Sequence, residues 1–178
     1  MKLSKQLLIA LAVCITVMGF SCRKDKDGLP KATEEGKNTF GCEVDGAIFI
    51  PKDVVTVPIT PGLSSYYDER KKLFHLFATE PRNEDGFKRN IFLEIQDLRQ
   101  GMNAIDEKNK ALVVFSKRYQ QDQYFKTNVT TGGTLTITRL DTVANIISGT
   151  FSFKAVPRLN PGPNIHVTDG RFDITYQP

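Results

Sequence analysis

The sequence predicts an all-β fold, either an antiparallel β-sandwich or a partly open barrel of about eight to ten strands. Three observations predict it. Apolar residues recur with period two, not 3.6, from Asn38 onward. Asp45-Gly46 and Asp169-Gly170 each lie between strand-like runs, and turn residues separate the other apolar runs. The one helical candidate, residues 103–111, is too polar and too short, so we expect residues 38–178 to form a single antiparallel β domain.

Residues 1–21 are predicted to be a signal peptide. Lys2 and Lys5 form a charged start, and residues 7–20 are a run of 14 residues without charge. This run is shorter than the ~20 residues that a membrane-spanning helix needs. An export signal is therefore the better interpretation.

Cys22 is the predicted lipidation site. Residues 17–22 (VMGFSC) resemble a bacterial lipobox, in which a peptidase cuts before a lipid-bearing cysteine. The resemblance implies a cell-envelope protein held at the outer membrane by its N-terminal lipid, palmitate included, on the periplasmic or cell-surface side. Alternatively, Gly19 and Ser21 suit an ordinary signal peptidase, and Cys22 would then be a thiol that could pair with Cys42.

Residues 22–37 are predicted to be the lipidated cysteine followed by a flexible charged tether. Nine of the fifteen residues at 23–37 are charged, and Gly28-Leu29-Pro30 breaks any helix. We expect almost nothing in this segment to be buried. A flexible chain of this length spans roughly 20 Å on average.

The domain is predicted to open with a β-hairpin. Residues 39–44 and 47–50 flank Asp45-Gly46, a pair that suits a two-residue type I′ turn because both turn positions need φ > 0. This turn would place Val44 opposite Ala47 and Cys42 opposite Phe49 on one face. We expect that face to be the core side, and Cys42 to be a small buried hydrophobe.

A second hairpin is predicted to close the domain. Residues 165–168 and 171–176 flank Asp169-Gly170, and this register would pair Val167 with Phe172 on an apolar face. It would also pair His166 with Asp173 on a polar, solvated face next to Arg171.

Further strands are expected between the two hairpins. Their segments alternate or are short and apolar, at residues 73–78, 90–96, 112–115, 133–138 and 147–153. Residues 54–67 are interrupted by Pro58, Pro61 and Gly62, which makes them an edge strand or a loop.

The ordered set of segments resembles a family of Bacteroidota lipoproteins with an all-β domain of unknown function. The resemblance spans nearly all of residues 38–176 and rests on residues 38–46 (NTFGCEVDG), 133–141 (GTLTITRLD), 147–153 (ISGTFSF) and 169–174 (DGRFDI). It implies a lipid-anchored, extracytoplasmic β domain. It implies no catalytic residues.

Composition and motifs argue against several classes of function. Without Lys2 and Lys5 the chain has 22 basic and 20 acidic residues and no basic stripe, so no nucleic-acid partner is expected. The only histidines are His75 and His166, so we predict no metal site, and no phosphate-loop or dinucleotide fingerprint predicts a cofactor. His166 beside Asp173 could orient a general base, but no nucleophile is placed, so no catalytic residue is predicted.

Four tyrosines form the predicted binding surface: Tyr66, Tyr67, Tyr119 and Tyr124. Exposed aromatic rings on loops or strand ends can stack on sugar rings or peptides, while the alternative is that they cap the ends of the core. We expect a non-enzymatic binding or assembly module, with a glycan or a protein as partner. The alternative is an envelope hydrolase whose site is assembled from residues distant in sequence.

Overall fold

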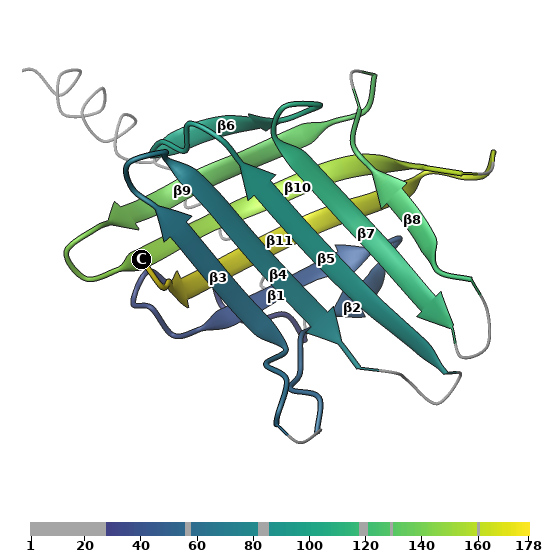
Figure 1. Cartoon of the computed structure of the whole chain (residues 1–178), viewed down its shortest axis with the longest axis horizontal. Helices are drawn as coiled ribbons and strands as arrows, with labels where there is room; N and C mark the ends of the chain where they lie inside the picture. The colour runs from purple at the N-terminus through teal and green to yellow at the C-terminus, as the bar shows by residue number, and fades with distance from the viewer. Residues whose placement is uncertain (1–27, 56–57, 82–85, 118–120, 129, 160) are drawn as a thin grey trace, which may run out of the picture.

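The chain folds into eleven antiparallel β-strands, with no helix among the residues described (Figure 1). A computed structural model describes residues 28–55, 58–81, 86–117, 121–128, 130–159 and 161–178. No stretch of these residues forms a helix that could cross a membrane. The all-β prediction is confirmed. The strands are β1 (Thr39–Val44), β2 (Ala47–Phe49), β3 (Leu63–Asp68), β4 (Leu73–Glu80), β5 (Phe87–Ile95), β6 (Gly101–Ile105), β7 (Lys110–Lys117), β8 (Gln123–Lys126), β9 (Gly133–Asp141), β10 (Ile146–Pro157) and β11 (Ile165–Thr175).

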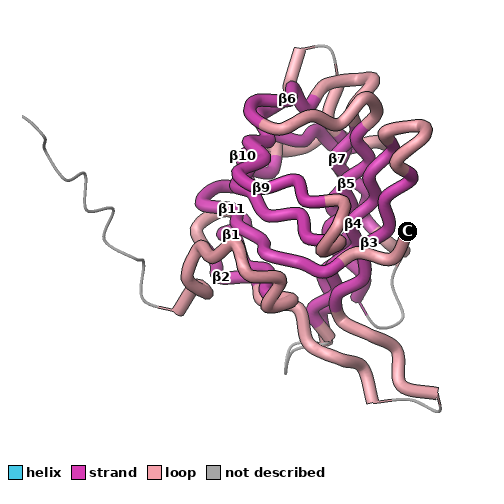
Figure 2. The backbone as a smooth tube through the Cα atoms, turned by 90° about the vertical axis from the view of Figure 1, so that its left-hand side faces the viewer, coloured by secondary structure: helices cyan, strands magenta, loops and turns pink. Residues whose placement is uncertain are grey.

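One continuous sheet curls into two layers. The first layer has the order β2-β1-β11-β10-β9-β6, and the second has the order β3-β4-β5-β7-β8. The long strand β10 belongs to both, because its first part pairs with β9 while Val156 and Pro157 pair with β8. Figure 2 shows the layers side by side, with β1, β9, β10 and β11 on one side and β3, β4, β5 and β7 on the other. The fold is therefore a curled half-barrel, which corresponds to the predicted partly open barrel.

The first predicted hairpin is confirmed. Asp45 and Gly46 have φ values of 50° and 78°, as a type I′ turn requires. Cys42 pairs with Phe49, and both side chains are fully buried. The turn chemistry of two residues thus set the register of both strands.

The second predicted hairpin is wrong. Residues 165–175 form one continuous strand, β11, which runs between β1 and β10. Asp169 does have φ 52°, but the left-handed residue sits in a β-bulge, where β11 has one residue more than β10 between Phe151 and Phe153. Gly170 packs against the Phe151 ring, to which an added Cβ would come within 2.5 Å.

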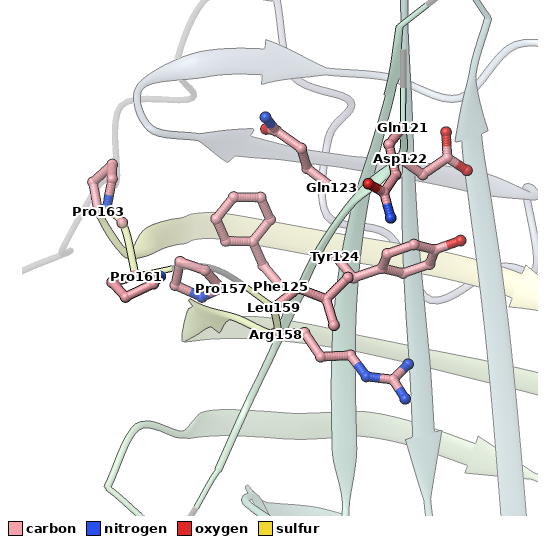
Figure 3. Close-up of a pocket in the computed structure, with 11 residues that line it drawn as sticks. Gln121, Asp122, Gln123, Tyr124, Phe125, Pro157, Arg158, Leu159, Pro161 and Pro163 are labelled. Atoms are coloured by element: carbon pink, nitrogen blue, oxygen red, sulfur yellow. The ribbon is translucent and has the colours of Figure 1, made fainter.

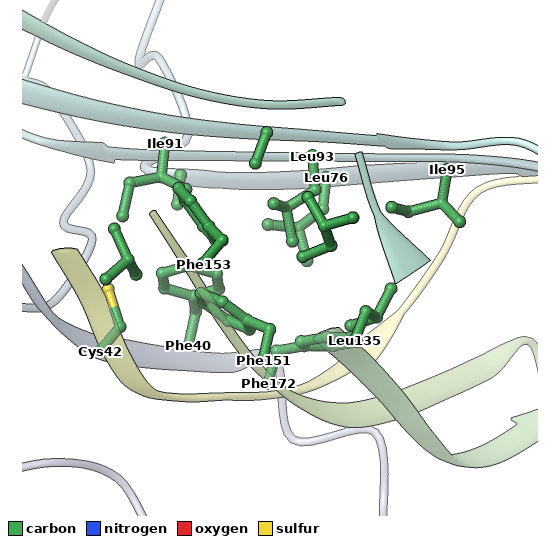
Figure 4. Close-up of a cluster of buried hydrophobic side chains, with 14 of the residues drawn as sticks. Phe40, Cys42, Leu76, Ile91, Leu93, Ile95, Leu135, Phe151, Phe153 and Phe172 are labelled. Carbon is green, nitrogen blue, oxygen red and sulfur yellow. The ribbon is translucent and has the colours of Figure 1, made fainter. Parts of the chain in front are cut away.

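The core lies between the two layers (Figure 4). Phe151 is its centre, with ring centroids 5.3 Å from Phe40 and 6.3 Å from Phe172. Across the layers, Phe172 stacks on Phe74 at 5.9 Å. Cys42 is a free thiol in this core, and burial raises its pKa, as expected of a small buried hydrophobe.

Residues 29–37 pack as a strap on the outer face of the first layer; we call them the N-terminal strap. Leu29 is buried, and an added Cβ on Gly41 of β1 would come within 2.5 Å of Pro30. The guanidinium of Arg139 donates to the Glu34 carbonyl, and the Thr175 hydroxyl donates to the Gly36 carbonyl at 3.2 Å. Leu29 is the one buried residue of the strap, so the expectation that almost nothing at 23–37 would be buried describes most of it. The strap nevertheless lies against the sheet, because it is hydrogen-bonded to β9 and β11.

Candidate functional site

An open pocket of about 490 Å³ lies where β8 meets the loop that follows β10 (Figure 3). One wall is residues 121–125, which lead into and include most of β8. The other is the end of β10 with the loop residues 158–159 and 161–163, and it includes Pro157, Pro161 and Pro163. A concave site with a mixture of polar and apolar groups is the usual form of a small-molecule site.

Backbone pairing holds the two walls together. β8 pairs with β7 on one side and with the end of β10 on the other. The Arg158 amide continues this ladder by donating to the Tyr124 carbonyl at 2.8 Å. Phe125 anchors the strand from below, because its ring makes an edge contact with Phe115, with centroids 5.7 Å apart. Pro157, Pro161 and Pro163 each have a restricted φ, and the paired strand β8 gives the pocket a hydrogen-bonded wall.

The polar side chains of the pocket are not used elsewhere in the described part of the chain. They offer two amides, a carboxylate, a phenol and a guanidinium. None of these groups makes a hydrogen bond or ion pair with another described side chain. The residues are Gln121, Gln123, Asp122, Tyr124 and Arg158. This arrangement leaves donors and acceptors available to a ligand.

The four predicted tyrosines occupy different environments. Tyr124 lines the pocket, and Tyr66 is 43% exposed on the outer face of β3. Tyr67 is only 3% exposed and packs edge-on against Tyr176 at 5.3 Å, so it caps the core instead of offering a binding surface. Tyr119 lies outside the described residues. The structure therefore does not gather the three described tyrosines, Tyr66, Tyr67 and Tyr124, into one surface.

The predicted pair of His166 and Asp173 does not form. His166 pairs across the ladder with Lys154, and Asp173 pairs with Ser148. Asp173 is fully buried under the N-terminal strap and accepts five hydrogen bonds. The donors are Thr33 Oγ1 (2.6 Å), Ser148 Oγ (2.8 Å) and the amides of Glu35 (3.0 Å), Gly36 (2.7 Å) and Lys37 (3.1 Å).

Two opposing effects act on the Asp173 carboxyl. Burial raises its pKa, because a carboxylate loses its hydration there. Hydrogen bonds from Thr33, Ser148 and the strap amides lower the pKa more strongly, to about 2 from the usual 3.8. Asp173 is thus a structural anion that holds the strap, and it does not line the pocket at β8.

A different histidine–carboxylate pair lies on the outer face of the second layer. His75 Nε2 is 3.6 Å from Glu94 Oε2, and the two side chains are 36% and 25% exposed. The His75 ring lies between Tyr66 and Phe92, with centroids 6.3 Å and 5.6 Å away. None of these residues lines the pocket at β8.

A second, more open hollow of about 730 Å³ lies beside the strap. It is lined by strap residues, the start of β1 and the loop at residues 50–53. Its one carboxylate, Asp53, already accepts a hydrogen bond from the Gly62 amide at 2.9 Å. Within the described residues no group of three or more His, Cys, Asp or Glu side chains could hold a metal ion.

Comparison with known families finds a match over about half of the chain. Residues 83–173 match the model of a domain of unknown function, DUF6252. The chain belongs to the DUF6252 family. The DUF6252 match begins just before β5 and ends at Asp173, so it includes both walls of the pocket. No curated protein and no solved structure matches the chain.

The DUF6252 match confirms the coarser part of the resemblance, a family whose domain has no known function. The Bacteroidota lipoprotein part of the resemblance stays a prediction. The sequence analysis did not identify Arg158 as part of a pocket. The stretch at 157–163 contains three prolines and a glycine, which was the available signal for a stiff loop.

Proposed function

We propose that this DUF6252 protein is a lipid-anchored module of the bacterial envelope that binds a partner and does not catalyse a reaction. The observation that carries the proposal is the pocket at β8, whose polar side chains are unused within the described chain. Binding residues concentrate on loops that a rigid scaffold positions, and a proline-rich loop beside a twice-paired strand is such a scaffold.

The path of the chain supports anchoring at the N-terminus. The strap enters the domain on the outer face of the first layer, where Arg171 donates to the Pro30 carbonyl at 3.4 Å. Gly28 lies beside Ile48 of β2, and Figure 2 shows β1 and β2 on the opposite side of the molecule from β3, β4 and β5. A lipid on Cys22 would therefore leave the second layer free to face away from the membrane.

The alternative function is an envelope hydrolase. The observation in its favour is the pair of His75 and Glu94, which could act as a general base. That pair lies on a sheet face and not in the pocket, and a general base must lie within about 3 Å of the proton that it takes. For this reason we favour the binding module.

The lipid anchor is tested by changing single cysteines in the full chain. Cells are fed labelled palmitate, and membranes are separated from soluble protein. Cys22→Ala should abolish the label and release soluble protein or leave uncleaved precursor. Several acyl chains hold a protein firmly in a membrane, and a protein without acyl chains lacks this anchor. Cys14→Ala is the matched control and should leave both label and fractionation unchanged. A Cys22→Ala protein that still carries label and sediments with membranes would contradict the proposal.

The choice between module and hydrolase needs a separate measurement. Envelope fractions from cells with the wild-type chain and with His75→Ala are assayed for hydrolysis of ester, peptide and glycoside substrates. The binding-module proposal expects equal rates in the two fractions. A rate that depends on the chain and is lost in His75→Ala, with an unchanged melting temperature, would favour the hydrolase.

A further inference from the structure

We infer that the pocket at β8 binds an uncharged carbohydrate, through hydrogen bonds to its hydroxyl groups and contact of one sugar face with Tyr124. This inference rests on the proposed binding function and names its ligand class. The residues that carry it are Gln121, Asp122, Tyr124 and Arg158, whose side chains lie on one side of β8 (Figure 3).

The charge of the pocket argues against an ionic ligand. Among the described residues that line it, one side chain is acidic, Asp122, and one is basic, Arg158. Anions such as phosphate or carboxylate are usually held by clustered arginines, and cations by clustered carboxylates or aromatic cages. A balanced pair favours neither sign of charge, so a neutral ligand fits this lining best.

The hydrogen-bonding groups favour a ligand that is rich in hydroxyls. A hydroxyl group both donates and accepts hydrogen bonds, so a pocket that binds it well has donors and acceptors close together. On the side of β8 where Tyr124 points, Gln121 offers a carbonyl and an NH₂ group, Asp122 accepts only, and Arg158 donates only (Figure 3). The Tyr124 ring adds a flat apolar surface for the C–H face of a sugar, while its hydroxyl donates or accepts.

The strand pairing argues against an extended peptide. Peptides that add a strand to a sheet need an exposed sheet edge. β8 is paired on both sides, with β7 and with β10, and the Arg158 amide is occupied by the Tyr124 carbonyl. Recognition in this pocket must therefore come from side chains, which suits a compact ligand.

The test is binding of neutral oligosaccharides to the purified full chain in mild detergent. The probes are cello-, malto-, xylo- and manno-oligosaccharides, with oligogalacturonate and chitosan oligomers as charged counterparts. Binding is measured on immobilised probes and by saturation-transfer NMR in solution. We expect at least one neutral series to bind, and Tyr124→Ala to weaken that binding about tenfold or more. Tyr66→Ala, an exposed tyrosine outside the pocket, should bind as the wild type does.

Two further variants separate a neutral ligand from an ionic one. Asp122→Asn and Arg158→Gln each keep a planar hydrogen-bonding group and change the pocket's charge by one in opposite directions. For an uncharged sugar, each should change affinity by only about threefold, and salt should have little effect because screening acts on charges. Circular dichroism and melting temperature show that each variant is folded.

Four results would overturn the inference, and the first three concern the probes. They are binding of the charged probes alone, binding of a neutral probe that Tyr124→Ala leaves unchanged, and no binding of any neutral probe at about 10 mM. A dissociation constant above about 10 mM would be too weak for a functional site. A protein partner captured through Tyr124 and Arg158 in place of a sugar would also overturn it. In each case the anchor at Cys22 keeps its own test, so the two failures are distinguishable.

Discussion

At the scale of single residues, Asp173 shows how a buried charge is made tolerable. A carboxylate taken out of water is costly unless it is fully hydrogen-bonded. Asp173 receives two hydroxyl and three backbone donors, and four of the five come from the strap, more than 130 residues earlier in the chain. Hydrogen bonds to a charged group are about twice as strong as neutral ones, so this one side chain joins strap and sheet.

Replacing the Asp173 carboxylate with an amide should therefore destabilise the domain. In Asp173→Asn, an NH₂ group would face N–H donors from the strap, so at least one buried donor loses its acceptor. We expect the free energy of unfolding to fall by about 2–3 kcal/mol, measured by urea denaturation. Glu107→Gln makes the same chemical change at an exposed position and should have almost no effect. Equal stability of the two variants would contradict this role of Asp173.

The same side chain predicts how stability depends on pH. The folded-state pKa of Asp173 is about 2, below the usual 3.8. A lowered carboxyl pKa contributes stability that is complete above about pH 4 and is lost as the pH falls through about 2. The melting temperature of the wild type should drop over this window by more than that of Asp173→Asn.

At the scale of elements, the N-terminal strap packs on the first layer of the sheet. It buries Leu29 and places its backbone amides on Asp173. A chain that starts at Gly28 should be as stable as the longer chain. One that starts at Asn38 should lose about 2–4 kcal/mol, from the lost apolar burial and hydrogen bonds. Thermal and urea unfolding of the two truncated chains checks this, and equal stability would show that the strap is dispensable.

Two Asp-Gly pairs show what a local signal can and cannot predict. Both supply the left-handed backbone that the sequence suggested, at Asp45 and at Asp169. The first is a hairpin turn, whereas the second is a bulge in an unbroken strand. Both structures need φ > 0 at this residue, so the dipeptide alone cannot distinguish them. The neighbouring strands decide between a turn and a bulge. At Asp169 the chain continues as one strand, because β10 pairs along β11 from residue 165 to 175 and β1 pairs with residues 167–173.

At the scale of the whole molecule, stability depends on contacts between the two layers. Phe172 of the first layer stacks on Phe74 of the second and also packs near Phe151. Phe172→Ala should lower the free energy of unfolding by about 3–5 kcal/mol, as for other buried phenylalanines. Phe77→Ala is the matched control, since Phe77 is 38% exposed on the outer face, and it should cost much less. An unchanged melting temperature in Phe172→Ala would contradict a core between the layers.

The candidate site was only partly predictable. Tyr124 was predicted as a surface aromatic and does line the pocket, but Tyr67 proved to be buried. Both are strand tyrosines, and whether a strand residue faces the core or solvent depends on a register that sequence reasoning did not assign there. Arg158 joins Tyr124 only because the end of β10 crosses from one layer to the other and pairs with β8.

What the sequence determined by itself is the all-β class, the first hairpin and its register, and the inward position of Cys42. These follow from alternation and turn chemistry, which act between residues a few positions apart. The tertiary structure decided the curl of the sheet through β10, the continuity of β11, the strap on Asp173 and the pocket at β8. Thr33 and Asp173 are 140 residues apart, and no local pattern encodes such a contact. The contact forms in the folded chain because a buried carboxylate without hydrogen-bond donors would be costly in free energy.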